Sequence, residues 1–116
     1  MKLTAELSRF KVKQGKMEAV EQWMDFLNEH MGHVLLTLED EKMFVETIFK
    51  EERDGEAYLY WYSVQGEDGI ELEDSNHEVD KKRMAFWNEC IDSTYGSVDM
   101  EPQVVMIQEK VRAAME

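Results

Sequence analysis

Residues 43–65 read MFVETIFKEERDGEAYLYWYSVQ, and this stretch decides the fold. Two apolar runs, Met43–Lys50 and Ala57–Gln65, lie on either side of Asp54-Gly55. Asp-Gly between two strand-like runs is a strong hairpin signal, because glycine at the second turn position accepts the positive φ that a tight turn needs. The stretch therefore predicts an antiparallel hairpin with a two-residue turn.

A two-residue turn also fixes which residues face each other. The predicted pairs are Arg53 with Glu56, Phe49 with Tyr60, Ile48 with Trp61, and Glu46 with Ser63. Because side chains alternate along a strand, one face is mainly aromatic and holds Val45, Thr47, Phe49, Tyr58, Tyr60, Tyr62 and Val64. The other face is mixed in polarity and holds Phe44, Glu46, Ile48, Trp61, Ser63 and Gln65. We expect the aromatic face to pack under helices and the mixed face to stay uncovered.

Patterns on both sides of the hairpin complete the fold. A strand is expected at Lys2–Lys13, followed by an amphipathic helix that Gly32 breaks. After the hairpin, Ser75 is a good N-cap for a second helix, and a last strand is expected at Met100–Glu109. The order β-α-β-β-α-β predicts an α+β, ferredoxin-like fold, in which a four-stranded antiparallel sheet carries two helices on one face.

Length and composition limit the function classes. We expect one domain over residues 1–116, which is long enough to bury a core. The net charge of −13 makes nucleic acid and anionic membranes poor partners, and no apolar run approaches the ~18 residues of a membrane helix. Cys90 is the only cysteine, which excludes an intrachain disulfide. We expect a cytoplasmic protein with no signal segment.

An uncovered sheet face has a consequence for assembly. It would expose Phe10, Val12, Phe44, Ile48 and Trp61 together, and monomers seldom expose so large an apolar patch. Two copies packed face to face about a two-fold axis would cover it. We therefore expect a homodimer that encloses a barrel-like interior.

The same interior would hold polar side chains. Glu6, Ser8, Glu46 and Ser63 are expected to point into it, and a bulge near Ser8-Arg9 would turn Arg9 inward beside the carboxylates. Buried carboxylates need hydrogen bonds, cations or raised pKa values. We therefore expect the protein to bind a small organic ligand in a pocket between the sheet and the helices, with these residues forming the site.

The sequence also resembles a known family. The runs that carry the resemblance are Glu6–Lys13, Val45–Phe49, Tyr58–Gly66 and His77-x-x-Asp80-Lys81-Lys82. They look like those of a small, acidic bacterial family of unknown function, over nearly the whole chain. That family is similar in fold to the dimeric α/β-barrel superfamily, which includes antibiotic-biosynthesis-type and haem-degrading monooxygenases. The resemblance implies a fold and a dimer but no activity.

The haem-degrading relatives offer a test of cofactor binding. They use an Asn on the first strand, a Trp on the third and a His on the second helix. This chain has Trp61 and His77 in loosely corresponding elements, but Ser8 or Glu6 stands where the Asn would be, and His77 lies in the first helical turn. We therefore carry over no haem and expect no cofactor. His30 and His33 miss the zinc-protease spacing, so no metal site is expected either.

Candidate chemistry rests on two residues. Glu46 would act as acid or base if it points inward, and His77 would act as a general base at the pocket mouth. The structural alternatives are a Glu46 that is salt-bridged across the dimer interface or reaches solvent, and a capping or surface His77. Trp61 would stack a flat ligand, with core packing as its alternative, and Ser63, Glu6, Ser8 and Arg9 would complete the binding site.

Three functions remain open. The first is a small-molecule enzyme, such as a cofactor-independent monooxygenase or isomerase, which needs Glu46 to face an open pocket. The second is a non-catalytic binding module, which has the same pocket but a paired Glu46. The third is a purely structural homodimer, whose aromatic side chains fill the interior. A cavity of about 300 Å³ or more beside Trp61 separates the third from the others.

Overall fold

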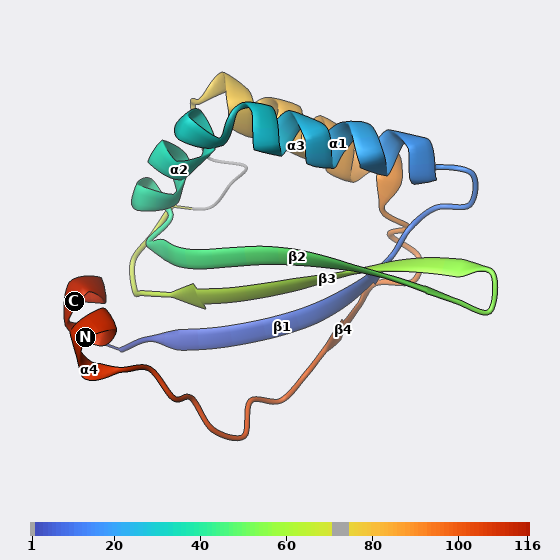
Figure 1. Cartoon of the computed structure of the whole chain (residues 1–116). Helices are drawn as coiled ribbons and strands as arrows, with labels where there is room; N and C mark the ends of the chain where they lie inside the picture. Colours follow the sequence, from blue (N-terminus) through green and yellow to red (C-terminus); the bar gives the residue numbers. More distant parts are fainter. Residues whose placement is uncertain (1, 71–74) are drawn as a thin grey trace.

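The computed structural model describes residues 2–70 and 75–116 and has the ferredoxin-like α+β architecture that the sequence predicts. The elements are, in order, β1 (Thr4–Lys11), α1 (Met17–Glu29), α2 (Met31–Asp40), β2 (Met43–Arg53), β3 (Glu56–Gln65), α3 (Glu78–Cys90), β4 (Ser97–Asp99) and α4 (Glu109–Met115). The strands form an antiparallel sheet in the order β2-β3-β1-β4. Helices α1, α2 and α3 lie over one face of this sheet (Figure 1).

The hairpin forms as the sequence predicts. Asp54 has φ 53° and Gly55 has φ 79°, so both turn residues adopt the positive φ of a tight two-residue hairpin turn. All four predicted residue pairs between β2 and β3 are confirmed. The Asp-Gly signal therefore specified the register of the hairpin from the turn as far as the pair Val45 and Val64.

The prediction of which face lies under the helices is wrong. Ile48 and Trp61 of the mixed face pack against the helical core, whereas Phe49 and Tyr62 are 55% and 37% exposed. The physical reason is that the helices present large aromatic rings, which the Trp61 indole complements. The tyrosine-rich face tolerates solvent, because a phenol keeps its hydroxyl wet or bonded, as Tyr60 does by donating to Glu51 at 2.7 Å.

The core is an aromatic layer between the sheet and the helices. Trp23 of α1 is 2% exposed, and its ring centroid lies 5.5 Å from that of Trp61 and 6.1 Å from that of Trp87 of α3. Phe10 of β1 packs edge-on against both Trp61 and Trp87. These ring contacts join the helices α1 and α3 to the strands β1 and β3.

Three local predictions are corrected. The expected bulge at Ser8-Arg9 is absent, because β1 pairs with β3 without interruption from Thr4 to Lys11, and the irregularity lies in β2 between Met43 and Val45. The first helix breaks at His30 rather than Gly32. Ser75 accepts a hydrogen bond from the His77 backbone N–H at 3.1 Å, but α3 begins only at Glu78.

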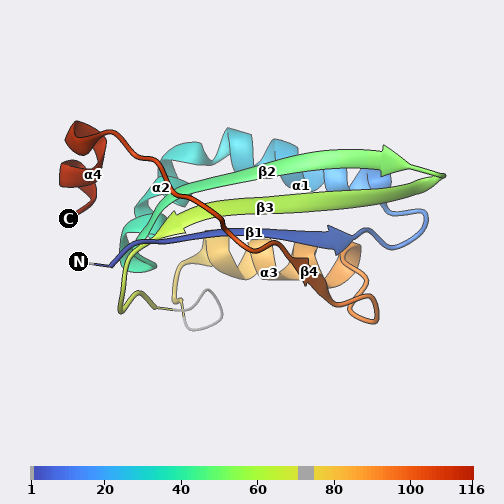
Figure 2. The ribbon, with the colours of Figure 1, turned by 90° about the horizontal axis from the view of Figure 1, so that it is seen from below.

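The last strand is shorter and earlier than expected. Only Ser97–Asp99 pair with β1, and residues 100–108, which include Pro102, join no strand or helix. Proline cannot donate to a strand ladder, which explains why the pairing stops before it. Figure 2 shows that this segment crosses the face of the sheet that the helices leave open, hereafter the uncovered face.

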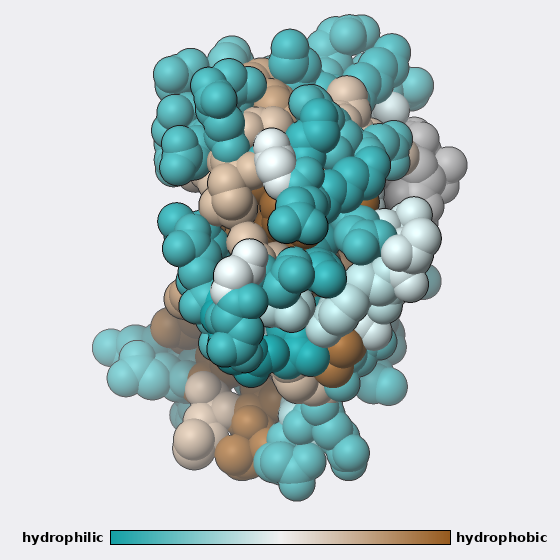
Figure 3. Space-filling model, turned by 90° about the vertical axis from the view of Figure 1, so that its right-hand side faces the viewer, coloured by the Kyte–Doolittle hydropathy of each residue, from teal (hydrophilic) through white to brown (hydrophobic). Residues whose placement is uncertain are grey.

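The segment that crosses the uncovered face carries exposed apolar side chains. Val104 is 70% exposed and Met106 is 85% exposed. In Figure 3, hydrophobic residues gather at the lower end of the molecule, whereas the helical layer above is mainly hydrophilic. Of the helices in the described ranges, none is both long and apolar enough to cross a membrane.

Candidate functional site

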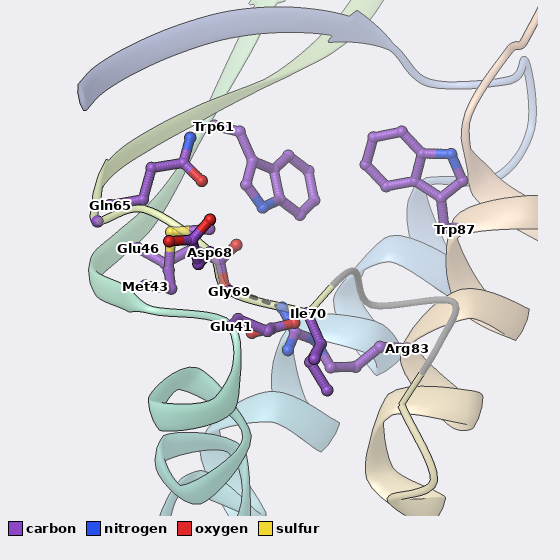
Figure 4. A pocket seen from close by; sticks show the side chains of 11 residues that line it. Glu41, Met43, Glu46, Trp61, Gln65, Asp68, Gly69, Ile70, Arg83 and Trp87 are labelled. Atoms are coloured by element: carbon purple, nitrogen blue, oxygen red, sulfur yellow. Dashed lines mark hydrogen bonds and ion pairs between the residues drawn. The ribbon is translucent and has the colours of Figure 1, made fainter. Parts of the chain in front are cut away.

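A cavity of about 310 Å³ opens between the sheet and the helices, at the end where α2 meets β2. It is lined by Glu41, Met43, Glu46, Trp61, Gln65, Gly66, Asp68, Gly69, Ile70, Arg83 and Trp87. These residues come from the α2–β2 turn, from β2, β3 and α3, and from the loop after β3 (Figure 4). Its size exceeds the threshold that separates a binding site from a filled interior.

Backbone contacts hold the loop after β3 against the α2–β2 turn. The Gly66 N–H donates to the Lys42 carbonyl at 2.8 Å, and the Ile70 N–H donates to the Asp40 carbonyl at 3.0 Å. Gly69 approaches the Glu41 backbone so closely that a Cβ at this position would overlap the Glu41 carbonyl. A glycine is therefore required here, and the loop is held in place as one wall of the cavity.

A buried ion cluster forms the floor of the cavity. The Arg83 guanidinium donates to Glu46 at 2.8 Å and to Asp80 at 3.3 Å. Arg83 is 6% exposed and Asp80 is 1% exposed. Among the described residues, the second carboxylate oxygen of Asp80, Oδ2, has no hydrogen-bond partner. Arg83, the only cation among the described residues that line the cavity, is therefore committed to two carboxylates.

Glu41 is the titratable group best suited to proton transfer here. Burial raises the pKa of its carboxyl from 4.5 to about 7, the nearby Arg83 cation opposes this, and Asp80, Glu46 and Asp40 add to it. A carboxyl with a pKa near neutrality is populated in both forms at physiological pH, so it can give or take a proton.

The opposite wall is aromatic. The ring centroids of Trp61 and Trp87 lie 5.2 Å apart in an edge-to-face arrangement. In Figure 4 the two indoles lie above the space, Glu41 lies below it, and Gln65 lies beside Trp61. The site thus combines an apolar aromatic wall with a carboxylate-rich wall.

The seven residues predicted for the site are not gathered in one place. Glu46 and Trp61 line the cavity, and buried Ser63 lies opposite Glu46 in the hairpin. His77 is absent from the lining, and its Nε2 lies 3.1 Å from an Asp40 carboxylate oxygen. The sequence left open whether Glu46 is a free acid or base or is salt-bridged. Glu46 is salt-bridged, and its partner is Arg83 of the same chain.

The other three residues lie away from this cavity. Ser8 donates to the Asp99 carboxylate at 2.7 Å, and Arg9 donates to the Tyr95 hydroxyl at 3.0 Å on the uncovered face. Glu6 is exposed and lines a second space of about 370 Å³ between the sheet and residues 100–107. The expectation that an inward-turned Arg9 neutralises the buried carboxylates is wrong, because Arg83 of α3 has that role.

Two important residues were missed from the sequence. Glu41 reads as part of the polar connection Glu39-Asp40-Glu41, and only its packing against the loop after β3 and α3 makes it unusual. Arg83 reads as one charge in the basic run Lys81-Lys82-Arg83. The one feature of the sequence that could have identified Arg83 as a site residue was its position on the inner side of the predicted second helix.

Comparisons with known proteins identify the family. The model of a family of unknown function, DUF6176, matches residues 3–113. No curated protein matches. Among solved structures, the L-rhamnose mutarotase FA22100 from Formosa agariphila is 18% identical, with a TM-score of 0.49 over 91% of this chain and 99% of that one. A likeness of this size says nothing about function. The match over nearly the whole chain confirms the expected resemblance, and the chain belongs to the DUF6176 family of unknown function.

Proposed function

We propose that the protein binds a small organic molecule in the cavity beside Trp61 and moves a proton on it with Glu41. The observation that carries this proposal is a cavity of about 310 Å³ with a carboxyl of pKa about 7 on one wall and two indoles on the other. Small-molecule sites usually occupy cavities of this size, in which aromatic side chains provide contact area and a few polar groups orient the ligand.

The reaction class that fits is an isomerisation by proton transfer. The Glu41 carboxylate would take a proton from a C–H next to an electron-withdrawing group of the ligand and return it at a neighbouring atom, so no oxidant or cofactor is consumed. Glu46 is not the base in this proposal, because its carboxylate is bonded to Arg83. Glu46 and Arg83 instead hold the floor of the cavity.

Binding is tested with a cavity-filling variant. Thermal-shift screening of a metabolite library against wild type and Gln65→Trp should give hits that the variant loses, because Gln65 lines the cavity. Gln22→Trp, on the exposed side of α1, adds the same ring elsewhere and should keep the hits. Hits that survive Gln65→Trp, in a variant that circular dichroism shows to be folded, would contradict the proposed site.

Proton transfer is tested on a compound found in this way. NMR should show solvent deuterium entering one carbon of the compound with wild type, and Glu41→Gln should stop this exchange while the compound still binds. Exchange at an unchanged rate in Glu41→Gln would remove Glu41 from the reaction. Binding without exchange in wild type would favour the second candidate, a non-catalytic binding module, which the paired state of Glu46 already supports.

We also propose that the protein is a homodimer that pairs through the uncovered face. The apolar side chains that support this are Phe49, Tyr62, Val98, Val104, Val105 and Met106, all exposed in the single chain. Monomers rarely leave a contiguous patch of this kind in water. This is the face opposite to the one expected from the sequence, so Ile48 and Trp61 take no part in the contact.

Sedimentation equilibrium tests the dimer. Wild type should sediment as a dimer at micromolar concentration, and Tyr62→Lys should shift it toward the monomer, because a charge placed in an apolar contact loses its hydration. Gln22→Lys, on the exposed side of α1 and away from the uncovered face, is the matched control. If wild type were still a monomer at a concentration 100 times higher than micromolar, the proposed dimer would be refuted.

A further inference from the structure

The charges around the cavity define which ligand it can hold. Glu41, Glu46 and Asp68 line it, against the single cation Arg83. Arg83 already donates to Glu46 and Asp80, so its charge is compensated before any ligand arrives. An anionic ligand would find no free cation among the lining residues and would meet several carboxylates, which costs free energy in a half-buried site.

One carboxylate oxygen of the ion cluster can still accept a hydrogen bond. Asp80 is 1% exposed, and its Oδ2 has no donor among the described residues. Asp80 carries the second carboxylate on Arg83, so the ion cluster as a whole has two negative groups for one positive group. The potential in the cavity is therefore negative even when Glu41 is protonated.

The aromatic wall adds a second preference. A cation over the face of an indole is attracted by the ring quadrupole, and tryptophan is the strongest such partner. Trp61 and Trp87 both line the cavity, across from Glu41. Carboxylates on one wall and indoles on the other are complementary to a positively charged organic group with apolar surface.

We propose that the cavity selects a small organic cation, such as a primary or quaternary ammonium compound. This inference rests on the proposed binding function and names its ligand class. The ammonium group lies between the carboxylates of Glu41 and Asp68, and its alkyl part lies against Trp61. The net charge of −13 on the whole chain draws such cations toward the protein.

Three compounds of nearly one shape test the ligand class. Choline is the cation, 3,3-dimethylbutan-1-ol is its neutral isostere, and 3,3-dimethylbutanoate is an anion of similar size. Butylamine is added as a primary ammonium compound. Each compound is titrated into the protein, and binding is followed by the chemical shifts of the amide and indole N–H groups. At least one of the two cations should bind at least tenfold more tightly than the alcohol or the anion. The shifts should centre on Trp61 and the loop at Gly66–Ile70.

Charge variants in an exposed loop complete the test. Asp68→Asn should weaken cation binding about two- to fivefold, the usual range for a partly exposed ion pair. Glu67→Gln removes the same charge one residue away, from an exposed side chain outside the lining, and should change the affinity less.

The outcomes separate this inference from the proposed function. If the alcohol or the anion binds as tightly as the cations, and Gln65→Trp abolishes that binding, the cavity is a ligand site but the inferred ligand class is wrong. If no compound of the four binds, the inference is overturned, while the library screen still decides the binding function. If Asp68→Asn and Glu67→Gln weaken cation binding equally, the attraction is general and the site is not selective.

Discussion

Replacing Glu41 with glutamine should change how stability depends on pH. Folding raises the pKa of this carboxyl from 4.5 to about 7, so the folded chain holds the proton more tightly than the unfolded chain. The contribution of Glu41 to stability is therefore fully present below pH 4.5 and falls as the pH rises through about 7. Above pH 7 the folded state bears the cost of a charged, half-buried carboxylate.

The size of this effect follows from the pKa shift. A fully buried group with this shift would lose about 3 kcal/mol. Because solvent reaches the Glu41 carboxyl and screens its charge, we expect about 1–2 kcal/mol. Glu41→Gln cannot ionise, so it should be more stable than wild type by about that amount at pH 8 and should gain little at pH 5.

Urea unfolding of both proteins at pH 5, 6, 7 and 8 measures the difference directly. Glu39→Gln, at an exposed position in the last turn of α2, corrects for the loss of one negative charge from a strongly acidic chain. A difference between wild type and Glu41→Gln that stays constant from pH 5 to pH 8 would refute the reasoning. So would a difference that Glu39→Gln reproduces.

Three further predictions concern the structure around the cavity. Arg83→Met should lower the free energy of unfolding by about 3 kcal/mol or more, measured by urea, since it leaves buried carboxylates without their cation; adding Glu46→Gln should recover part of the loss. Gly69→Ala should displace the loop from Glu41, seen as faster hydrogen exchange of the Ile70 N–H, and unchanged protection would contradict the close approach. Gly55→Ala should cost about 1 kcal/mol by urea unfolding because φ is positive there, whereas Gly55→Asn should cost less.

The candidate site was only partly visible in the sequence. Trp61 and Glu46 were selected because one is a large ring and the other a charge within an apolar strand, and both line the cavity. His77 was selected for its residue type at a helix start, which says nothing about its neighbours in space. Glu41 could not be found, because its unusual pKa arises from packing against segments 25 to 42 residues away in the chain.

The sequence by itself determined the features that depend on interactions between neighbouring residues. Asp54-Gly55 has only one comfortable way to turn between two strands, so the hairpin and its residue pairs follow from a few neighbouring residues. The order of strands and helices follows from the period of the apolar residues in the same way. Each of these features is complete within a short stretch of chain.

Only the tertiary structure decided which side of the sheet the helices cover. A period of two separates the two faces of a strand but does not say which one is buried, and both faces here carry aromatic residues. The choice depended on the fit of Trp23 and Trp87 against Trp61, and on Arg83 reaching Glu46 across the layer. Those contacts join residues that are distant in sequence, and their energies exist only once the helices have packed.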